Sequence, residues 1–330
     1  MNRNLDCHSR FSGVRSLVVA LTLCISGAMS TNAGLIAYEG FDYAPDAGIS
    51  GLNGGFGWGN SWVTAGGSEF ATNVSGSLSY GGVSSTGNAL RVGVASDLSQ
   101  GNPGTQAPQR NLENPLGTYG STIWIGLLWQ SLTTDAERGS LAGFRETKIG
   151  FFDGANPASM SRTGTERVAV GIPHTYTANG TVNGVPNQQL LDEYSIYLSS
   201  TQQASGVATE RGTDPANTVF LLLRMDLDGT AANDTLSLWV NPNVGAGEGG
   251  LGAAMAIWNT VNLDAINGFR FQVANSNASG INGQMLVDEL RIGTTFADTV
   301  TGIPEPGALA LVGIGAAALM IVVRRNRRNQ

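Results

Sequence analysis

Asp234-Thr235-Leu236-Ser237-Leu238-Trp239-Val240 is the stretch of sequence that most clearly indicates the fold. Successive side chains of a strand point to opposite faces, so Leu236, Leu238 and Val240 share one face. Trp239 points away from them, toward the other face. The stretch therefore predicts a β-strand with one face in a hydrophobic core.

The same alternation recurs along the chain. Phe269, Phe271 and Val273 share one face, and Arg270 and Gln272 share the other. The stretch at residues 123–128 is apolar on both faces, so we expect it to be covered on both sides. Further candidate strands lie at residues 35–42, 89–94, 142–152, 166–171, 193–198, 218–226 and 284–292. The pattern predicts an all-β protein with a single jelly-roll sandwich over residues 34–302.

One long segment lacks this pattern. Residues 96–117 are polar and contain Pro103, Pro108 and Pro115. Proline cannot donate a backbone hydrogen bond to a sheet ladder. We therefore predict that this segment is a surface loop.

Composition limits the function. The chain has 330 residues, of which 42% are hydrophobic and only 13% charged, and its formal net charge is −7. Of the 25 acidic residues, all but Asp6 and Glu305 lie within residues 34–303, so this segment has 23. Of the 18 basic residues, seven arginines lie outside it, so the segment has 11. This segment therefore carries about −12, which argues against nucleic acid or anionic lipid as a partner. Neutral polysaccharide and calcium-bridged anionic glycan stay open.

The start of the chain resembles a secretory signal peptide. Its positive charges are Arg3, Arg10 and Arg15, and an apolar run follows at residues 17–25. A membrane-spanning helix is the alternative, but it needs about 20 apolar residues. We predict a signal peptide at residues 1–33 that is delivered to the Sec translocon and cleaved after Ala28 or Ala33.

Both cysteines of the chain, Cys7 and Cys24, fall within this predicted signal peptide. The exported chain would then contain no disulfide, no thiol nucleophile and no cysteine-ligated metal. Its stability would rest on the packing of its core.

The end of the chain has three features in order. Pro304, Glu305 and Pro306 precede an apolar stretch at residues 307–323, which as a helix would span about 26 Å of membrane. A basic cluster follows, formed by Arg324, Arg325, Arg327 and Arg328. Such a cluster stays on the cytoplasmic side of a membrane, which would leave the preceding domain outside. A plain tail anchor is the alternative interpretation.

These three features resemble the PEP-CTERM sorting signal. The resemblance covers residues 303–330 and implies processing by an exosortase, a membrane transpeptidase-like enzyme. It also implies an exopolysaccharide-producing Gram-negative bacterium. We therefore expect an exported protein at the cell surface or outside the cell, anchored in the membrane transiently or stably by the C-terminal helix.

Several stretches of residues 35–299 resemble concanavalin A-like (LamG-type) jelly rolls of other PEP-CTERM proteins. They are Tyr38-Glu39-Gly40-Phe41-Asp42-Tyr43 with Trp58 and Trp62, residues 220–228, residues 236–242 and residues 287–298. The resemblance implies that the first and last strands lie side by side.

Catalytic motifs are missing from the sequence. A glycoside hydrolase needs two carboxylates about 5–9.5 Å apart. Related jelly-roll hydrolases carry Glu-x-Asp-x-x-Glu on one strand, and this motif does not occur here. The adjacent pairs Asp192-Glu193 and Asp288-Glu289 would point to opposite faces of a strand. His174 is the one histidine after the signal peptide, and no Gly-x-Ser-x-Gly motif occurs. We predict that the protein is not an enzyme.

Asp288 is the first calcium candidate. Alternation places it with Leu290 and Ile292 on the apolar face, where a carboxylate must be hydrogen-bonded, ion-paired or bound to metal. A strand-end aspartate that binds the backbone, or a bulge that reverses the alternation, would explain it without calcium.

Asp226 and Asp228 are the second candidates, in Asp226-Leu227-Asp228-Gly229. Carboxylate oxygens suit Ca²⁺, but the remaining ligands of an EF-hand loop are missing. A polar hairpin loop is the alternative. No other cofactor is expected.

Trp239 is the candidate for sugar contact, because it faces away from the predicted core. A ring that covers a neighbouring strand is the alternative. The sequence thus predicts an exported structural or adhesive matrix protein associated with exopolysaccharide. A lectin-like domain, with or without calcium, is the alternative, and a glycoside hydrolase is the third interpretation.

Overall fold

Residues 34–303 form one compact unit of the chain. The computed structural model describes residues 34–65, 71–93, 107–132, 147–153, 166–172, 181–182, 185–186, 193–198, 203–210, 217–229, 233–273 and 284–301. The predicted signal peptide and the predicted tail helix at residues 307–323 lie outside these ranges. Among the described residues, no helix is both long enough and apolar enough to cross a membrane.

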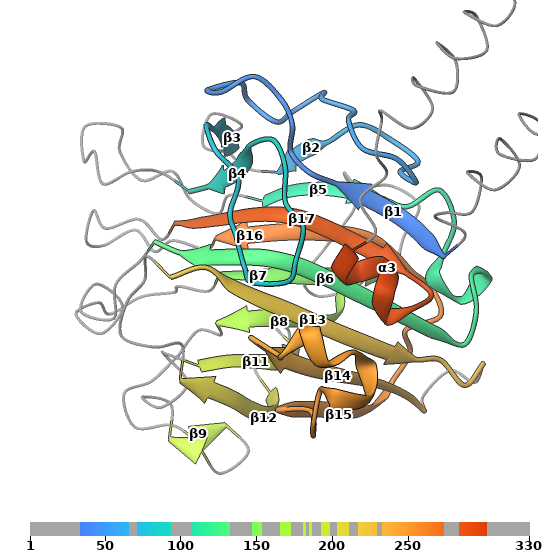
Figure 1. Cartoon of the computed structure of the whole chain (residues 1–330). Helices are drawn as coiled ribbons and strands as arrows, with labels where there is room; N and C mark the ends of the chain where they lie inside the picture. Colours follow the sequence, from blue (N-terminus) through green and yellow to red (C-terminus); the bar gives the residue numbers. More distant parts are fainter. Residues whose placement is uncertain are drawn as a thin grey trace, which may run out of the picture. The chain divides into compact units, whose positions relative to one another are not determined.

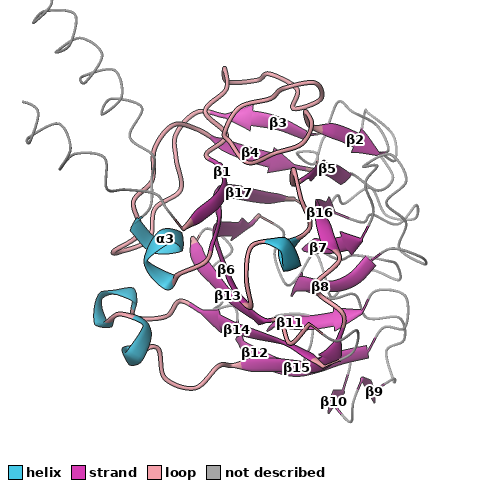
Figure 2. Ribbon diagram, turned by 90° about the vertical axis from the view of Figure 1, so that its right-hand side faces the viewer, coloured by secondary structure: helices cyan, strands magenta, loops and turns pink. Residues whose placement is uncertain are grey.

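Two antiparallel sheets form a sandwich (Figures 1 and 2). The eight-stranded sheet has the order β15 (Ala256–Val261), β14 (Asp234–Val240), β13 (Val219–Asp226), β6 (Thr122–Ser131), β17 (Met285–Gly293), β4 (Ala89–Val92) and β3 (Ala71–Val74). β1 (Leu35–Glu39) also pairs with β17, antiparallel, as expected for the first and last strands.

The other sheet has seven strands. Its order is β12 (Gln203–Glu210), β11 (Glu193–Leu198), β8 (Glu166–Ile172), β7 (Thr147–Asp153), β16 (Ile266–Val273), β5 (Ala107–Asn111) and β2 (Val63–Ala65). The remaining elements are the hairpin of β9 (Thr181–Val182) and β10 (Val185–Pro186), the 3-10 turns η3 (Leu116–Thr118), η6 (Val244–Ala246) and η7 (Glu248–Gly250), and the helix α3 (Phe296–Thr301).

The prediction of a loop at residues 96–117 is wrong for β5. This strand pairs with β16 at residues 109–111 and with β2 at residues 107–109, and all five of its residues are buried. Pro108 is tolerated because it precedes the residues that pair with β16 and faces the three-residue strand β2 at the sheet edge. Proline content therefore misled the sequence interpretation here.

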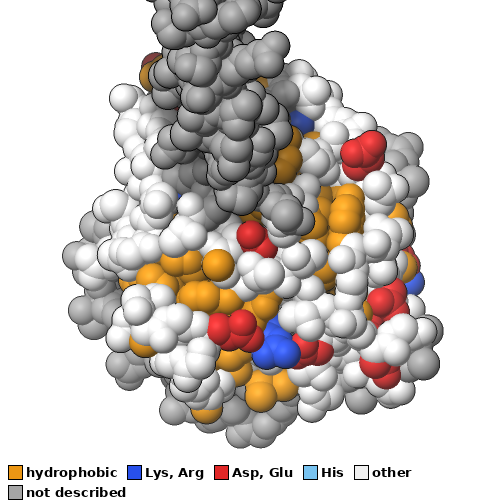
Figure 3. Space-filling view, turned by 45° about the vertical axis from the view of Figure 1, so that its right-hand side comes forward, with side chains coloured by type: hydrophobic (Ala, Val, Ile, Leu, Met, Phe, Trp, Pro, Cys, Tyr) orange, Lys and Arg blue, Asp and Glu red, His pale blue; other side chains and the backbone are white. Residues whose placement is uncertain are grey.

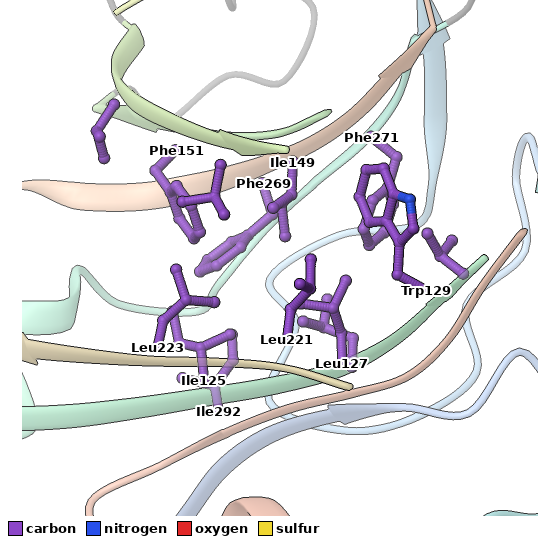
Figure 4. Close-up of a cluster of buried hydrophobic side chains, with 14 of the residues drawn as sticks. Ile125, Leu127, Trp129, Ile149, Phe151, Leu221, Leu223, Phe269, Phe271 and Ile292 are labelled. Atoms are coloured by element: carbon purple, nitrogen blue, oxygen red, sulfur yellow. The ribbon is translucent and has the colours of Figure 1, made fainter. Parts of the chain in front are cut away.

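The core lies between the two sheets. Phe269 and Phe151 of the seven-stranded sheet pack edge to face with ring centroids 5.5 Å apart, and Ile125 and Leu223 lie opposite them (Figure 4). Leu236, Leu238 and Val240 belong to this core, as do Phe269, Phe271 and Val273. The face assignments made from alternation are confirmed for both strands, and so is the all-β sandwich.

A second apolar layer covers the outside of the eight-stranded sheet. Trp124, Phe220, Leu222 and Trp239 point outward from it and are buried. The residues that pack on them come from the segment at residues 78–89, from η6 and from α3: Leu78, Val83, Ala89, Val244, Phe296 and Val300. The expectation that residues 123–128 are covered on both faces is confirmed.

Candidate functional site

The face of the seven-stranded sheet that points away from the core is polar. Strand register sets Gln109, Arg270, Gly150, Ala169 and Tyr197 side by side in one row across β5, β16, β7, β8 and β11. A second row contains Gln272, Lys148, Gly171 and Ser195. We call this surface the polar face, and its polar side chains are Gln109, Lys148, Glu166, Ser195, Tyr197, Arg270 and Gln272.

Ion pairs and hydrogen bonds hold the polar face in place. Lys148 Nζ lies 2.8 Å and 3.0 Å from the two carboxylate oxygens of Glu166, and both side chains are at most 1% exposed. Arg270 Nε donates to Gln109 Oε1 at 2.7 Å, and its guanidinium lies 4.7 Å from the ring centre of Phe152. Buried charges are costly unless they are paired, so these contacts hold the two cations at fixed positions.

The chemistry of the polar face is that of hydrogen bonding. It combines two cations, two amides, two hydroxyls and one carboxylate on neighbouring strands of a rigid sheet. Such groups can hydrogen-bond hydroxyl or carboxylate groups, and rigid strands keep their geometry precise. All seven side chains are, however, at most 8% exposed, so in this structure they are not open to solvent.

Asp226 lies on the outward face of the eight-stranded sheet, at the end of β13. Its Oδ1 accepts hydrogen bonds from Arg224 Nε at 2.9 Å and from Thr122 Oγ1 at 3.2 Å. Arg224 also lies 3.6 Å from Glu248 and over the ring of Trp124. Figure 3 shows one face of the molecule, on which acidic and basic side chains lie among hydrophobic ones.

Asp228 follows in the β13–β14 hairpin. Its backbone N–H donates to Asp234 Oδ1 at 2.9 Å, and the other oxygen of Asp234 accepts from the Leu263 N–H at 2.6 Å. Burial raises the pKa of nearby Asp264, and the charges of Asp234 and Asp228 raise it further. Because backbone donors occupy Asp234, the arrangement corresponds to a hydrogen-bonded hairpin loop.

Calcium binding finds no support in the described part of the chain. No group of three or more histidine, cysteine, aspartate or glutamate side chains there could hold a metal ion. The structure does not bring Asp226, Asp228 and Asp288 together. Asp226 is paired with Arg224, and Asp288 of β17 is hydrogen-bonded to residues 77 and 78.

Asp288 corrects the predicted alternation of the last strand. A bulge between Asp288 and Arg291, with Glu289 at φ 53°, reverses the parity, so that Val287 and Leu290 both face the core. Asp288 therefore points outward, opposite to the face on which alternation places it together with Leu290 and Ile292.

The partners of Asp288 come from the segment after β3 and from the next residue of β17. Its Oδ2 accepts from Ser77 Oγ at 2.5 Å and from the Leu78 N–H at 2.9 Å, and its Oδ1 accepts from the Glu289 N–H at 2.8 Å. Burial, the largest cause, raises the pKa of this carboxyl to about 8, and the charge of Glu289 also raises it. The bulge and the backbone contacts, one of the explanations left open by the sequence, account for this residue.

Trp239 faces away from the core, as predicted, but it is not open to solvent. The residue is only 9% exposed, and its ring stacks on Trp124 with centroids 5.9 Å apart. Its Nε1 donates to the Gly252 carbonyl at 3.2 Å, because residues 241–254 pack over it. The ring is therefore buried against Trp124, and this burial gives no support to sugar stacking on Trp239.

The remaining predicted site residues lie outside the described part of the chain. They are the motif residues Pro304, Glu305 and Pro306, and the cluster Arg324, Arg325, Arg327 and Arg328; His174 lies outside it as well.

Sequence reasoning did not identify the polar face as a site. Arg270 and Gln272 were placed opposite the core, but nothing in the sequence connected them with Gln109, Lys148 or Tyr197. The useful signal is a strand with apolar side chains on one face and polar side chains, such as Arg270 and Gln272, on the opposite face. It becomes a site only when register places the strands side by side.

Comparison with known proteins identifies the C-terminal segment. Residues 302–328 match the PEP-CTERM protein-sorting motif. No curated protein matches the chain significantly.

Similar solved structures include endo-beta-1,4-glucuronan lyase from the fungus Trichoderma reesei, with 14% identity and a TM-score of 0.39 over 74% of this chain and 93% of that chain. The VIP36 exoplasmic/lumenal domain in its Ca²⁺/Man2-bound form has 10% identity and a TM-score of 0.40 over 71% and 81%. The carbohydrate recognition domain of Emp46p in its metal-free form has 9% identity and a TM-score of 0.37 over 70% and 87%. Likeness at this level carries no argument about what this chain does.

The motif match begins directly after α3, the last described element of the sandwich. Such a motif marks a protein that is exported, sorted to the cell surface and processed by an exosortase. The chain is therefore an all-β sandwich of two antiparallel sheets that carries a C-terminal PEP-CTERM protein-sorting motif.

Proposed function

We propose that this protein is a structural or adhesive component of the cell surface or extracellular matrix, associated with exopolysaccharide and without catalytic activity. The observation that carries the proposal is the sorting motif at residues 302–328. The net charge of about −12 over residues 34–303 favours neutral polymers over nucleic acid as neighbours.

The buried carboxylates support a structural role. Glu39, Asp234 and Asp288 each accept two or more hydrogen bonds from fixed donors of the sandwich. A general acid or base must instead reach a substrate proton. These three side chains therefore serve the fold.

The test follows the full chain in an exopolysaccharide-producing host and in a derivative that makes none. We expect the mature protein in the exopolysaccharide fraction of the first host and free in the medium of the second. Glu305→Gln should leave the protein unprocessed in the membrane fraction. Glu248→Gln, at an exposed acid outside the motif, is the matched control and should behave like the natural chain. Equal release from both hosts would contradict the association with exopolysaccharide.

The second candidate function is glycan binding by the polar face, a lectin-like role. The specific observation is the alignment of Gln109 and Arg270 in one row with Tyr197, and of Gln272 and Lys148 in the next. Hydrogen-bonding side chains on adjacent strands match the closely spaced hydroxyl groups of a polysaccharide. All five are at most 6% exposed, so this role requires that the face become accessible before a glycan binds.

Affinity electrophoresis of the full chain in detergent, through gels that contain the host exopolysaccharide, tests this role. We expect retardation that persists in chelator and is lost in Arg270→Gln. Arg224→Gln removes an arginine from the other sheet and should leave retardation unchanged. Circular dichroism of both variants checks that they are folded. Retardation that survives in Arg270→Gln, or that is absent in the natural chain, would exclude the polar face as a glycan site.

A further inference from the structure

The two last strands of the chain lie in the middle of the two sheets. β17 has β6 on one side and both β4 and β1 on the other. β16 has β7 on one side and β5 on the other. In Figure 1 both strands cross the centre of the sandwich, next to strands from the start of the chain.

This placement divides the other strands into two blocks. The first block is β1 to β5, residues 35–111, and the second block is β6 to β15, residues 122–261. Within the described strands, β1, β3 and β4 reach the rest of their sheet only through β17, and β2 and β5 reach theirs only through β16. No strand ladder of the described residues joins the two blocks directly.

The first block has its own internal contacts across the two sheets. Glu39 of β1 and Arg110 of β5 form a buried ion pair. Backbone bonds tie the segment after β1 to β3: the Ile49 N–H donates to the Ala71 carbonyl, and the Asp46 N–H donates to the Asn73 carbonyl. Its strands are therefore organised among themselves but have no sheet partner toward the second block.

β17 supplies both the missing partner and a set of side-chain contacts. One cross-strand row runs from Leu90 through Val287 to Trp129, so Val287 packs between the two blocks in the core. Outside the sheet, Asp288 binds Ser77 and Leu78 of the first block.

Arg291 extends these contacts to the end of the domain. Its Nη1 donates to the Val300 carbonyl in α3 at 2.6 Å, its Nη2 donates to the Ser84 carbonyl, and Nη2 pairs with Glu289 at 2.8 Å. The side chain is fully buried. It thereby attaches the last helix to the first block.

Contacts between residues far apart in sequence form only after the chain between them is closed into a loop, and a strand without its neighbour leaves backbone groups unpaired. The segment at residues 78–89 does touch the second block, since Tyr80 stacks on Phe220 and its hydroxyl donates to the Pro242 carbonyl at 3.0 Å, but these contacts pair no strands. We infer that β16 and β17 close the sandwich, so that the strands of the first block gain their partners toward the second block only when residues 266–293 have been delivered. A chain exported from its N-terminus stays incompletely folded until α3 appears, and the sorting motif follows α3 directly at residue 302. Completion of folding and arrival of the sorting motif at the membrane would then coincide.

The order of folding is measurable on the full chain. We would refold it from denaturant in detergent and label the backbone amides by pulsed hydrogen exchange. Amides of β1, β3 and β4 should gain protection together with those of β17 and never before them. Protection of β3 and β4 ahead of β17 would overturn the inference. The result does not depend on glycan binding, so it can fail without affecting the proposed function.

A pair of matched variants sharpens this test. Val287 in β17 and Val219 in β13 flank Trp129 in the same row, and both are buried. Val287→Ala should slow the protection of β3 and β4 several-fold, whereas Val219→Ala should act first on β6 and β13. If Val287→Ala left the rate of protection of β3 and β4 unchanged, β17 would not be the closing strand.

Discussion

The carboxylate of Glu39 and the guanidinium of Arg110 join the two sheets, with Oε2 and Nη1 2.5 Å apart and both side chains only 1% exposed. The same carboxylate accepts hydrogen bonds from Trp62 Nε1 and from the Tyr43 hydroxyl, each at 2.9 Å. The guanidinium lies 5.1 Å from the ring centre of Trp58. Two opposite charges are thus buried in an aromatic corner and satisfied by one another.

Removal of one partner should cost more than the pair itself contributes. Glu39→Ala leaves Arg110 buried without its counter-ion, and we expect the free energy of unfolding to fall by about 3–5 kcal/mol. Asp226→Ala breaks an exposed ion pair, with Asp226 41% exposed, and should cost at most about 1 kcal/mol. Urea unfolding of both variants measures the difference. Equal losses of unfolding free energy in the two variants would contradict the prediction that burial makes the loss of Glu39 more costly than the loss of Asp226.

Asp288 makes stability depend on pH. The pKa of its carboxyl is raised from the ordinary 3.8 to about 8, so the folded protein holds this proton more tightly than the unfolded chain does. Its contribution to stability is present below about pH 3.8, declines as the pH rises, and is lost above about pH 8.

Asp288→Asn removes this titration and should flatten the pH dependence of the unfolding midpoint between those limits. Part of the decline of the unfolding midpoint with rising pH should persist in this variant, because burial also raises the pKa of Glu39. Asp226→Asn, at an exposed carboxyl, serves as the control. An unchanged pH profile for Asp288→Asn would show that the proton on this carboxyl is not linked to folding.

Gly171 tests the backbone beneath the polar face. It has φ 148°, and a Cβ there would lie 2.2 Å from the Thr147 carbonyl oxygen of the neighbouring strand. Gly171→Ala should therefore destabilise the protein by about 1–3 kcal/mol. Gly48→Ala meets nothing within 4 Å and should change stability by at most about 0.5 kcal/mol. Thermal unfolding compares the two, and a tolerated Gly171→Ala would show that β7 and β8 can separate slightly without loss.

Trp239 is expected to matter for packing. Trp239→Ala removes a ring that stacks on Trp124 and should cost about 3–5 kcal/mol in unfolding free energy. Trp239→Phe keeps an aromatic ring and should cost less. Retardation by exopolysaccharide should be unchanged in Trp239→Phe. Loss of retardation in this folded variant would restore the residue as a sugar contact.

Much of the architecture was predictable because its signals are local. Alternation over 234–240 and 269–273 assigns each side chain to a face, since the period of a strand is set by its own backbone. The sorting motif is likewise a linear feature, readable from Pro304, Glu305 and Pro306 without any fold. These signals were sufficient for the all-β class and for the direction in which Trp239 points.

The remaining features depend on partners distant in sequence. The bulge at Glu289 reverses the outward face of β17, and one such residue shifts every side chain after it. β5 is a strand despite Pro108 because β16 lies beside it. The burial of Trp239 depends on residues 241–254 packing over its ring.

The sequence by itself thus determined the β class, the core-facing residues of the clearest strands and the C-terminal motif, because each is encoded within a few neighbouring residues. Only the tertiary structure decided that Gln109, Lys148 and Arg270 share one polar face and that β16 and β17 join the two blocks. Register and strand order are set by pairing across long loops, and no local pattern specifies which strands become neighbours.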